Sequence, residues 1–242
     1  MKEKLTVCWI SAGVSSFVAG YLYRDHVDKF LYISIQDQHP DSDRFIADCS
    51  RAMNRDIEYI YPYYKNVEQV ALANSCLNTP NGAPCTKYLK KRTRKKWEYQ
   101  HRDFDITYVW GFDVDEKDRA ERVVEGMPEF EHVFPLIDHG LSKSDAHGVC
   151  AALGIKRPIL YDMGYKNNNC LGCLKGGKGY FNKIRKDFPE VFKERAELER
   201  KIGRSIIRDK NGMCFLDELD PDAGRMSDEV DIECSIACQI LL

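Results

Sequence analysis

The chain of 242 residues is long enough for one sizeable α/β core with a small C-terminal elaboration, and too short for two ordinary domains. Its 36 Lys and Arg residues nearly balance 38 Asp and Glu residues, and the formal net charge of -2 excludes a whole-chain field that would attract a nucleic acid or a membrane. The apolar runs are short and broken by charges, and no export signal opens the sequence, so we expect a cytoplasmic protein without a membrane partner.

Strand and helix patterns alternate along the first two-thirds of the chain. This alternation is typical of parallel sheets with right-handed crossovers. We predict an open, mostly parallel five-stranded α/β sheet with helices on both faces over residues 1–165. Residues 166–242 are predicted to form a Cys-rich extension, helical and irregular, packed on the same domain. The strand patterns are 4–10, 30–35, 56–64, 104–112 and 132–137.

A turn of small residues, Ser11–Ser16, separates the first strand from the first helix. Ligands of open parallel sheets bind at this end of the strands, where backbone N–H groups and a helix N-terminus favour anions. Gly13 can take a backbone conformation closed to other residues, and Ser11, Ser15 and Ser16 can donate hydroxyl hydrogen bonds to a phosphate. An ordinary tight turn is the competing interpretation.

Two further segments are candidates for contacts to a nucleotide. The second strand pattern ends near Asp37 and is followed by His39, Asp41 and Asp43, where an adenosine ribose or base would lie, although a solvated acidic loop explains them equally well. A run of cations on a predicted helix would neutralise phosphates if it faced a ligand, and a solvated helix face is the alternative. The run contains Lys87, Lys90, Lys91, Arg92, Arg94, Lys95 and Lys96.

Ten cysteines in a chain expected in the cytosol favour metal or thiol chemistry over disulfides. The spacing of Cys170 and Cys173 in a Gly- and Asn-rich turn lets both thiolates reach one metal ion or cluster. Further ligands must come from elsewhere, and Cys85 is the third candidate. Three cysteines at apolar positions are predicted to be buried structural thiols, namely Cys8, Cys49 and Cys150.

Cys234 and Cys238 lie near the end of the chain. Their spacing is compatible with a redox pair or a second site. For Cys234, the roles of nucleophile, cluster ligand and unremarkable tail residue are all open.

Taken together, these motifs resemble the phosphoadenylyl-sulfate (PAPS) reductase family, within the N-type ATP pyrophosphatase (PP-loop) superfamily of adenine-nucleotide alpha-hydrolase-like folds. The most specific match is Pro158–Tyr165 leading into Asn169–Cys173, which looks like the family's Leu-Tyr-Asp-x-Gly-Tyr segment and its Cys-x-x-Cys. The Ser11–Ser16 turn resembles the superfamily's Ser-Gly-Gly-x-Asp-Ser with a Gly and the Asp replaced, which puts pyrophosphatase chemistry in question. The resemblance runs from about Leu5 to Cys238.

Two weaker matches complete the resemblance. The segment from Gly111 through Glu116 to Arg119 looks like the family's Gly-x-Arg-x-x-Glu-Ser-x-x-Arg without its first Arg, and Arg122 follows it. Cys234 lies in Glu-Cys-Ser-Ile-Ala, which resembles the reductases' Glu-Cys-Gly-Ile-His, whose Cys attacks the sulfonyl sulfur.

The resemblance implies a 4Fe-4S cluster held by Cys85, Cys170 and Cys173, with zinc as the weaker alternative. Only three ligands match, because Thr86 stands where a fourth would be. The resemblance also implies that residues 1–165 bind an adenine nucleotide, and that Cys234 is the catalytic nucleophile. The implied nucleotide contacts are Ser11, Gly13, Ser15, Ser16, Asp37, Lys90, Gly111 and Arg119.

Three functions follow from these expectations. The first is thiol-dependent reduction of a sulfonucleotide, PAPS or its unphosphorylated form APS, with a thioredoxin-like reductant as partner. The second is an ATP-dependent, iron-sulfur-containing PP-loop enzyme that thiolates a nucleic acid. The third is a nucleotide-binding module without catalysis, since a fold does not fix a function. A homodimer is left open.

Overall fold

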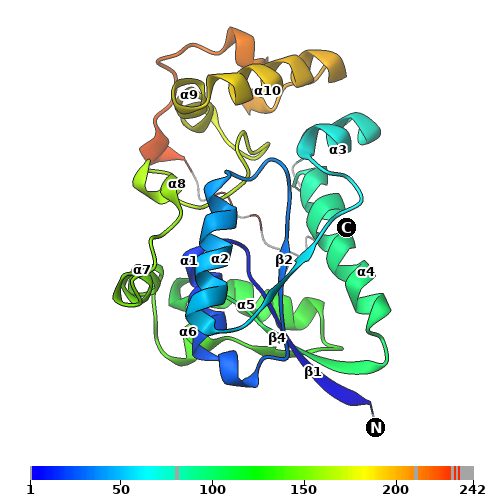
Figure 1. The fold of residues 1–242 in the computed structure, drawn as a ribbon. Coiled ribbons are helices and arrows are strands. Elements are labelled where there is room, and N and C mark those ends of the chain that lie inside the picture. The colour runs from blue at the N-terminus through cyan, green and yellow to red at the C-terminus, as the bar shows by residue number, and fades with distance from the viewer. Residues whose placement is uncertain (1, 80–81, 210–211, 230–231, 233, 235–242) are drawn as a thin grey trace.

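The computed structural model describes residues 2–79, 82–209, 212–229, 232 and 234. At its centre five parallel strands pair in the order β3-β2-β1-β4-β5 (Figure 1). This confirms the predicted parallel α/β sheet. The strands are β1 (Glu3–Trp9), β2 (Lys29–Ile33), β3 (Ile57–Ile60), β4 (Phe104–Val109) and β5 (Glu131–Val133).

Helices connect the strands and cover both faces of the sheet (Figure 1). The α-helices are α1 (Val14–Leu22), α2 (Asp41–Met53), α3 (Val67–Asn74), α4 (Arg92–Gln100), α5 (Lys117–Gly126), α6 (Pro135–Asp138), α7 (Lys143–Ala152), α8 (Ile159–Asp162), α9 (Lys178–Asp187) and α10 (Pro189–Ile202). Short 3-10 turns are η1 (Arg24–His26), η3 (Val114–Glu116), η4 (Leu216–Glu218) and η5 (Met226–Asp228), and η2 (Thr86–Lys91) is a π-helix.

Strand β1 is buried on both sides, and its side chains alternate between two apolar clusters. Val7 and Trp9 pack with side chains of α3, α4 and α5, while Cys8 and Ile10 pack with those of α1, α2 and α7. Because side chains of a strand point alternately to opposite faces, a central strand needs apolar residues at every position. The apolar run 7–10 has this origin, whereas Glu3 and Lys4 at the start of the strand are exposed.

The C-terminal extension adds its apolar side chains to one of these two clusters. Tyr180, Phe181, Ile184 and Leu198 of α9 and α10 belong to the cluster that also contains Val7. In Figure 1, α9 and α10 lie at the opposite end of the molecule from the N-terminus. The extension therefore packs at the end of the sheet toward which β1 runs.

Local structure departs from the sequence pattern in three places. The predicted basic helix begins as the π-helix η2 before it continues as α4. The fifth strand ends before Pro135, which cannot donate to the ladder and begins α6. An antiparallel hairpin, β6 (Ile207–Asp209) with β7 (Gly212–Cys214), lies where the sequence shows no periodicity. Of the described helices, none has the length and apolar composition required to cross a bilayer.

Candidate functional site

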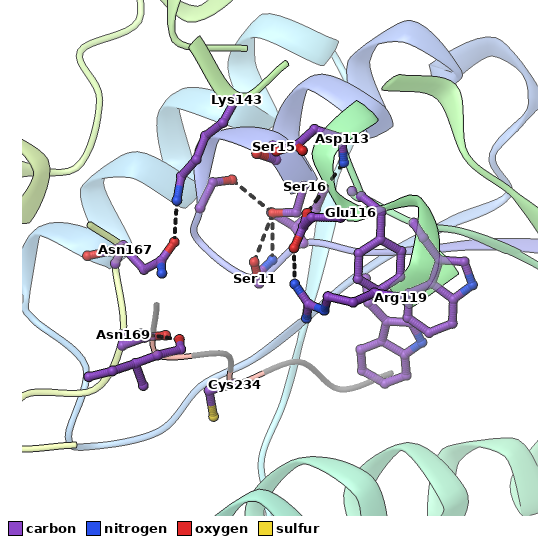
Figure 2. A pocket seen from close by; sticks show the side chains of 18 of the residues that line it. Ser11, Ser15, Ser16, Asp113, Glu116, Arg119, Lys143, Asn167, Asn169 and Cys234 are labelled. Carbon is purple, nitrogen blue, oxygen red and sulfur yellow. Dashed lines mark hydrogen bonds and ion pairs between the residues drawn. The ribbon is translucent and has the colours of Figure 1, made fainter. Parts of the chain in front are cut away.

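A cavity of about 540 Å³ opens at the carboxyl ends of β1 and β4. Its wall combines the turn after β1, the segment after β4, an Asn-rich segment of the extension, and the C-terminal residues 232 and 234. Figure 2 shows Ser11 and Ser16 facing the cavity, Glu116 and Arg119 beside them, and Cys234 across from the turn. The cavity occupies the usual ligand position of an open parallel sheet.

The turn after β1 is organised by the hydroxyl of Ser16. Its Oγ accepts hydrogen bonds from the backbone N–H of Ser11 at 3.0 Å and pairs with the Ser11 Oγ at 3.1 Å, and it donates to the Gly13 carbonyl at 2.9 Å. Among the described side chains none caps the N-terminus of α1. The first N–H groups of α1, near Ser15, therefore stand at the cavity without a side-chain acceptor, an arrangement suited to an anion.

The left-handed backbone conformation, which a glycine adopts most readily, occurs at Ala12 and not at Gly13. Gly13 is extended, with φ of -105°, and a Cβ there would meet only ordinary contacts at 3.5 Å. Ala12 has φ of 58° and is fully buried, and its carbonyl accepts from Asn168 Nδ2 at 2.8 Å. This tertiary contact holds a conformation that costs an alanine about 1–2 kcal/mol.

Gly111, at the end of β4, packs directly on the turn. A Cβ at this position would lie 2.4 Å from the Ser16 Cα and 2.6 Å from its N, so any side chain displaces the turn. The need for a glycine here is steric, because its neighbour is backbone that cannot rotate away.

We expect Gly111→Ala to lower the free energy of unfolding by about 1–3 kcal/mol, the usual cost of overpacking. Denaturant unfolding would measure it. Gly148→Ala is the matched control, because a Cβ there has nothing within 4 Å on helix α7 and the substitution should stabilise by up to about 1 kcal/mol. Equal stability of the two variants would contradict the close approach at Gly111.

Charges of both signs line the cavity. Arg119 is ion-paired with Glu116, and its guanidinium lies 4.9 Å from the centre of the Phe112 ring. Lys143 donates to Asn167 Oδ1 at 2.6 Å, and Arg122 is exposed at the wall. The cationic lining side chains are Lys90, Arg119, Arg122 and Lys143, and the acidic ones are Asp113, Asp115, Glu116 and Asp118.

Burial, with a smaller contribution from Asp115, raises the pKa of Asp113 above its usual range, although a backbone N–H opposes this shift. The predicted contacts Ser11, Gly13, Ser15, Ser16, Lys90, Gly111 and Arg119 all line this one cavity.

Three consecutive asparagines that the sequence analysis did not assign tie the extension to the cavity. Asn167 bonds Lys143, Asn168 bonds the Ala12 carbonyl and the Ser42 hydroxyl, and Asn169 donates to the Ile232 carbonyl at 2.9 Å. The run Asn-Asn-Asn directly before Cys170 was the available signal.

The C-terminal segment returns to the cavity by three anchors. Glu229 accepts from the N–H groups of Gly177 and Gly179 at 2.9 and 2.8 Å, at the start of α9. Asn169 then holds residue 232, and Lys90 Nζ donates to the Cys234 carbonyl at 2.8 Å. These contacts place Cys234 at the cavity wall. Cys238 lies outside the described residues.

Four thiols, those of Cys85, Cys170, Cys173 and Cys234, interact with one another near Lys90. Burial raises the pKa of Cys85, raises that of Cys170 well above its usual range, and raises that of Cys173 to about 11. Cys170 and Cys234 line the cavity, whereas Cys85 and Cys173 lie in the apolar cluster behind it.

Cys234 differs from the other three thiols. Burial acts to raise its pKa, but Lys90 and Lys175 and the Thr86 hydroxyl outweigh it, and the pKa is below the ordinary value of a thiol. Its Sγ lies 3.7 Å from Thr86 Oγ1 and points away from the serine turn in Figure 2. Cys234 is thus the member of the group that ionises first.

Cysteine thiolates are the ligands of iron-sulfur clusters, so the donor chemistry of the four thiols suits one. Within the described ranges no three His, Cys, Asp or Glu side chains are gathered as ligands of a metal ion. We therefore derive no step through a cluster, and the ligand roles of Cys85, Cys170 and Cys173 stay a prediction.

Asp37 does not line the cavity. Its carboxylate pairs with Arg195 at 2.5 Å, where both side chains are nearly buried, and accepts from the N–H of Val67 at 2.7 Å. Arg195 also donates to the carbonyls of Leu171 and Gly172 inside the Cys-x-x-Cys turn. In this structure Asp37 therefore braces that turn.

The fold recurs in a solved structure, that of phosphoadenylyl-sulfate (PAPS) reductase from Candida auris in its phosphate complex. The two match with a TM-score of 0.50 over 68% of this chain and 80% of that chain, at 11% sequence identity. The chain shares this reductase's fold. A scan against protein-family models finds no match, and a search of the curated proteins finds no significant one. The likeness to PAPS reductase accordingly concerns the fold, and the chemistry must be argued from the cavity.

Proposed function

We propose that this chain is an adenine-nucleotide enzyme of the PAPS reductase type, which reduces PAPS or APS at the described cavity. The observation that carries the proposal is the position of Cys234, fastened through its carbonyl to Lys90 at the wall of a cavity whose far side is the serine turn. The lowered pKa of Cys234 supports the same role.

The proposed reaction has two steps. The Cys234 thiolate attacks the sulfur of the sulfonucleotide, an S–S bond forms, and the S–O bond to the phosphate breaks so that the nucleotide leaves with the electron pair. One thiolate of a thioredoxin-like dithiol then attacks the Cys234 sulfur and expels sulfite. Its second thiol breaks the mixed disulfide that results, so the dithiol becomes a disulfide and Cys234 leaves as a thiolate. Because Sγ points toward Thr86, the side chain must turn toward the cavity before the attack.

In this proposal the backbone N–H groups at the start of α1 and the hydroxyl of Ser15 hold the nucleotide phosphate, and the Ser11 hydroxyl, which donates to Ser16 Oγ, shapes the turn. Arg122 and Lys143 add positive charge at the same wall. They would favour a polyanionic nucleotide whose sulfate extends toward residue 234.

The test is sulfite release from PAPS and from APS with thioredoxin, alongside calorimetric titration with both and with ATP. Release of sulfite from either sulfonucleotide supports the proposal and identifies the substrate. Tight nucleotide binding without release, under oxygen-free conditions and after iron reconstitution, would replace it with the non-catalytic binding module.

We further propose a 4Fe-4S cluster at Cys85, Cys170 and Cys173, which would require these thiols to rearrange around it. Protein purified without oxygen should contain iron and acid-labile sulfide and absorb visible light. The double variant Cys170→Ala, Cys173→Ala should lose the iron, the sulfide and the absorbance. Iron at the same level in this variant would remove the pair from the ligand set, and zinc in place of iron would select the weaker alternative.

The carboxylates at the cavity favour one second candidate, an ATP-dependent thiolating enzyme. Asp113, Asp115, Glu116 and Asp118 line the cavity and have hard carboxylate oxygens, and Mg²⁺ that accompanies a bound triphosphate is held by one or two such carboxylates together with the phosphates. Within the described residues these carboxylates are not gathered as a metal site before the triphosphate binds. This candidate requires magnesium-dependent consumption of ATP in the presence of a nucleic acid. Sulfur incorporation without ATP would exclude it.

A further inference from the structure

The exposed cations of η2 and α4 form a strongly basic surface, and they are not among the residues that line the cavity. Between Lys87 and Arg102 the sequence contains one carboxylate, Glu98, and that carboxylate accepts from the Tyr108 hydroxyl at 2.7 Å and lies 3.4 Å from Arg94 Nε. The positive charge of the exposed side chains is therefore not balanced by acidic neighbours on the same segment.

Five side chains recur every three or four residues from η2, through α4, to the turn that follows α4. We call them the tyrosine–cation stripe: Tyr88, Arg92, Lys95, Tyr99 and Arg102. The Arg92 guanidinium lies 4.2 Å from the centre of the Tyr88 ring, and that of Arg102 lies 4.8 Å from the Tyr99 ring. Tyr99 is 69% exposed, and the three cations are exposed too. Two of the rings are thus each paired with an arginine, and all three cations are open to solvent.

The loop after β3 extends this face with further tyrosines. Tyr64 contacts Tyr88 edge to face at 5.8 Å, and Tyr63 contacts Tyr64 in the same way at 5.0 Å. Tyr63 is 91% exposed and Tyr61 is 72% exposed. In Figure 1 this loop, which leads from β3 to α3, passes beside α4. Exposed rings grouped in this way mark an interaction surface rather than scattered surface residues.

We propose that the tyrosine–cation stripe and the loop 61–65 bind single-stranded nucleic acid. Unpaired bases stack on tyrosine and arginine planes, and Lys and Arg side chains neutralise phosphates, so a surface that combines exposed rings with exposed cations offers both kinds of contact to a single strand. A duplex hides its base faces and would leave the rings of Tyr63 and Tyr99 without a partner. The proposal is independent of the reaction at the cavity.

The test is fluorescence anisotropy of the full-length chain with labelled oligo(dT) and oligo(U), across a series of salt concentrations. The stacking variant is Tyr63→Ser with Tyr99→Ser, and the charge variant is Arg92→Gln with Lys95→Gln. Matched controls remove two exposed lysines of the extension, Lys186→Gln with Lys193→Gln. All of these side chains are exposed, and circular dichroism would confirm that the variants fold.

We expect the stacking variant to weaken binding about tenfold or more without changing the salt dependence. The charge variant should lower the slope of log affinity against log salt by about 1.4, or about 0.7 for each cation removed. The control variant should bind as the wild type does. Tighter binding of oligo(U) than of oligo(dT) would assign RNA, and the reverse would assign DNA.

Three results would overturn the proposal. One is the absence of oligonucleotide binding at about 100 µM protein, the weak end of non-specific affinity. Another is equal affinity for a blunt duplex of the same length. The third is binding of poly-glutamate that is as tight as that of the oligonucleotides and insensitive to the stacking variant, which would assign the surface to an acidic protein.

Discussion

Cys234→Ser is expected to lower sulfite release by a factor on the order of 10³ or more while nucleotide binding stays within a few-fold of the wild type. A serine hydroxyl at this position is not ionised at neutral pH and cannot form the S–S bond that the proposed reaction needs. The serine turn and the cations of the cavity do not depend on the sulfur, so the ground-state complex should form. Steady-state sulfite assays and calorimetric titration would separate the two effects.

Cys214→Ser is the matched control for this loss. Cys214 is half-buried in the β6–β7 hairpin, and it does not line the cavity. Its substitution should leave turnover unchanged. If Cys234→Ser protein retained turnover while its fold and iron content were normal, residue 234 would not be the nucleophile.

Lys90→Met is expected to raise the pKa of Cys234 and, at pH below that pKa, to slow sulfite release roughly threefold for each unit by which the pKa rises, because the fall in thiolate fraction is partly offset by the higher nucleophilicity of a more basic thiolate. Burial alone would raise this pKa, and after burial the Lys90 ammonium makes the largest contribution, with opposite sign. Methionine keeps the length of the side chain and removes its charge, together with the bond to the Cys234 carbonyl.

The pH dependence of alkylation would measure the direction in which Lys90→Met shifts the pKa of Cys234. The rate at which Cys234 reacts with iodoacetamide should fall as the pH drops through the pKa of its thiol. Because the wild-type pKa is lowered, this fall should occur at a lower pH than for an ordinary thiol. In Lys90→Met the same fall should occur at higher pH. Lys193→Met, which removes an exposed lysine of α10, should keep the wild-type profile. Identical profiles for all three proteins would exclude Lys90 as the source of the lowered pKa.

The sheet and the turn Ser11–Ser16 could be predicted from sequence because both are local patterns. Apolar runs of strand length alternated with helical periodicity, and the Ser11–Ser16 turn followed the first strand directly. The structure confirms the parallel sheet, and places the serines at the carboxyl end of β1. The hairpin β6–β7 was missed because its strands have three residues each, too few to show a period.

The assembly of the site could not be predicted in the same way, because it depends on contacts between distant segments. Asp37 was expected at a ribose, but its partner Arg195 lies 158 residues further along the chain. Lys90 was one of seven cations in a run, and the sequence did not show which of them points inward. The π-helix η2 changes the number of residues per turn, so α-helical periodicity does not identify the inward side chain. The contact of Glu229 with the start of α9 likewise follows no spacing rule.

The most direct test of the account is mass spectrometry of the chain after incubation with PAPS or APS in the absence of any reductant. The account predicts a sulfonate adduct on the peptide that contains Cys234, formed with release of the nucleotide and removed by thioredoxin as sulfite appears. Sulfite release with no adduct on Cys234, or an adduct on Cys170 in its place, would contradict the assignment of Cys234 as the nucleophile.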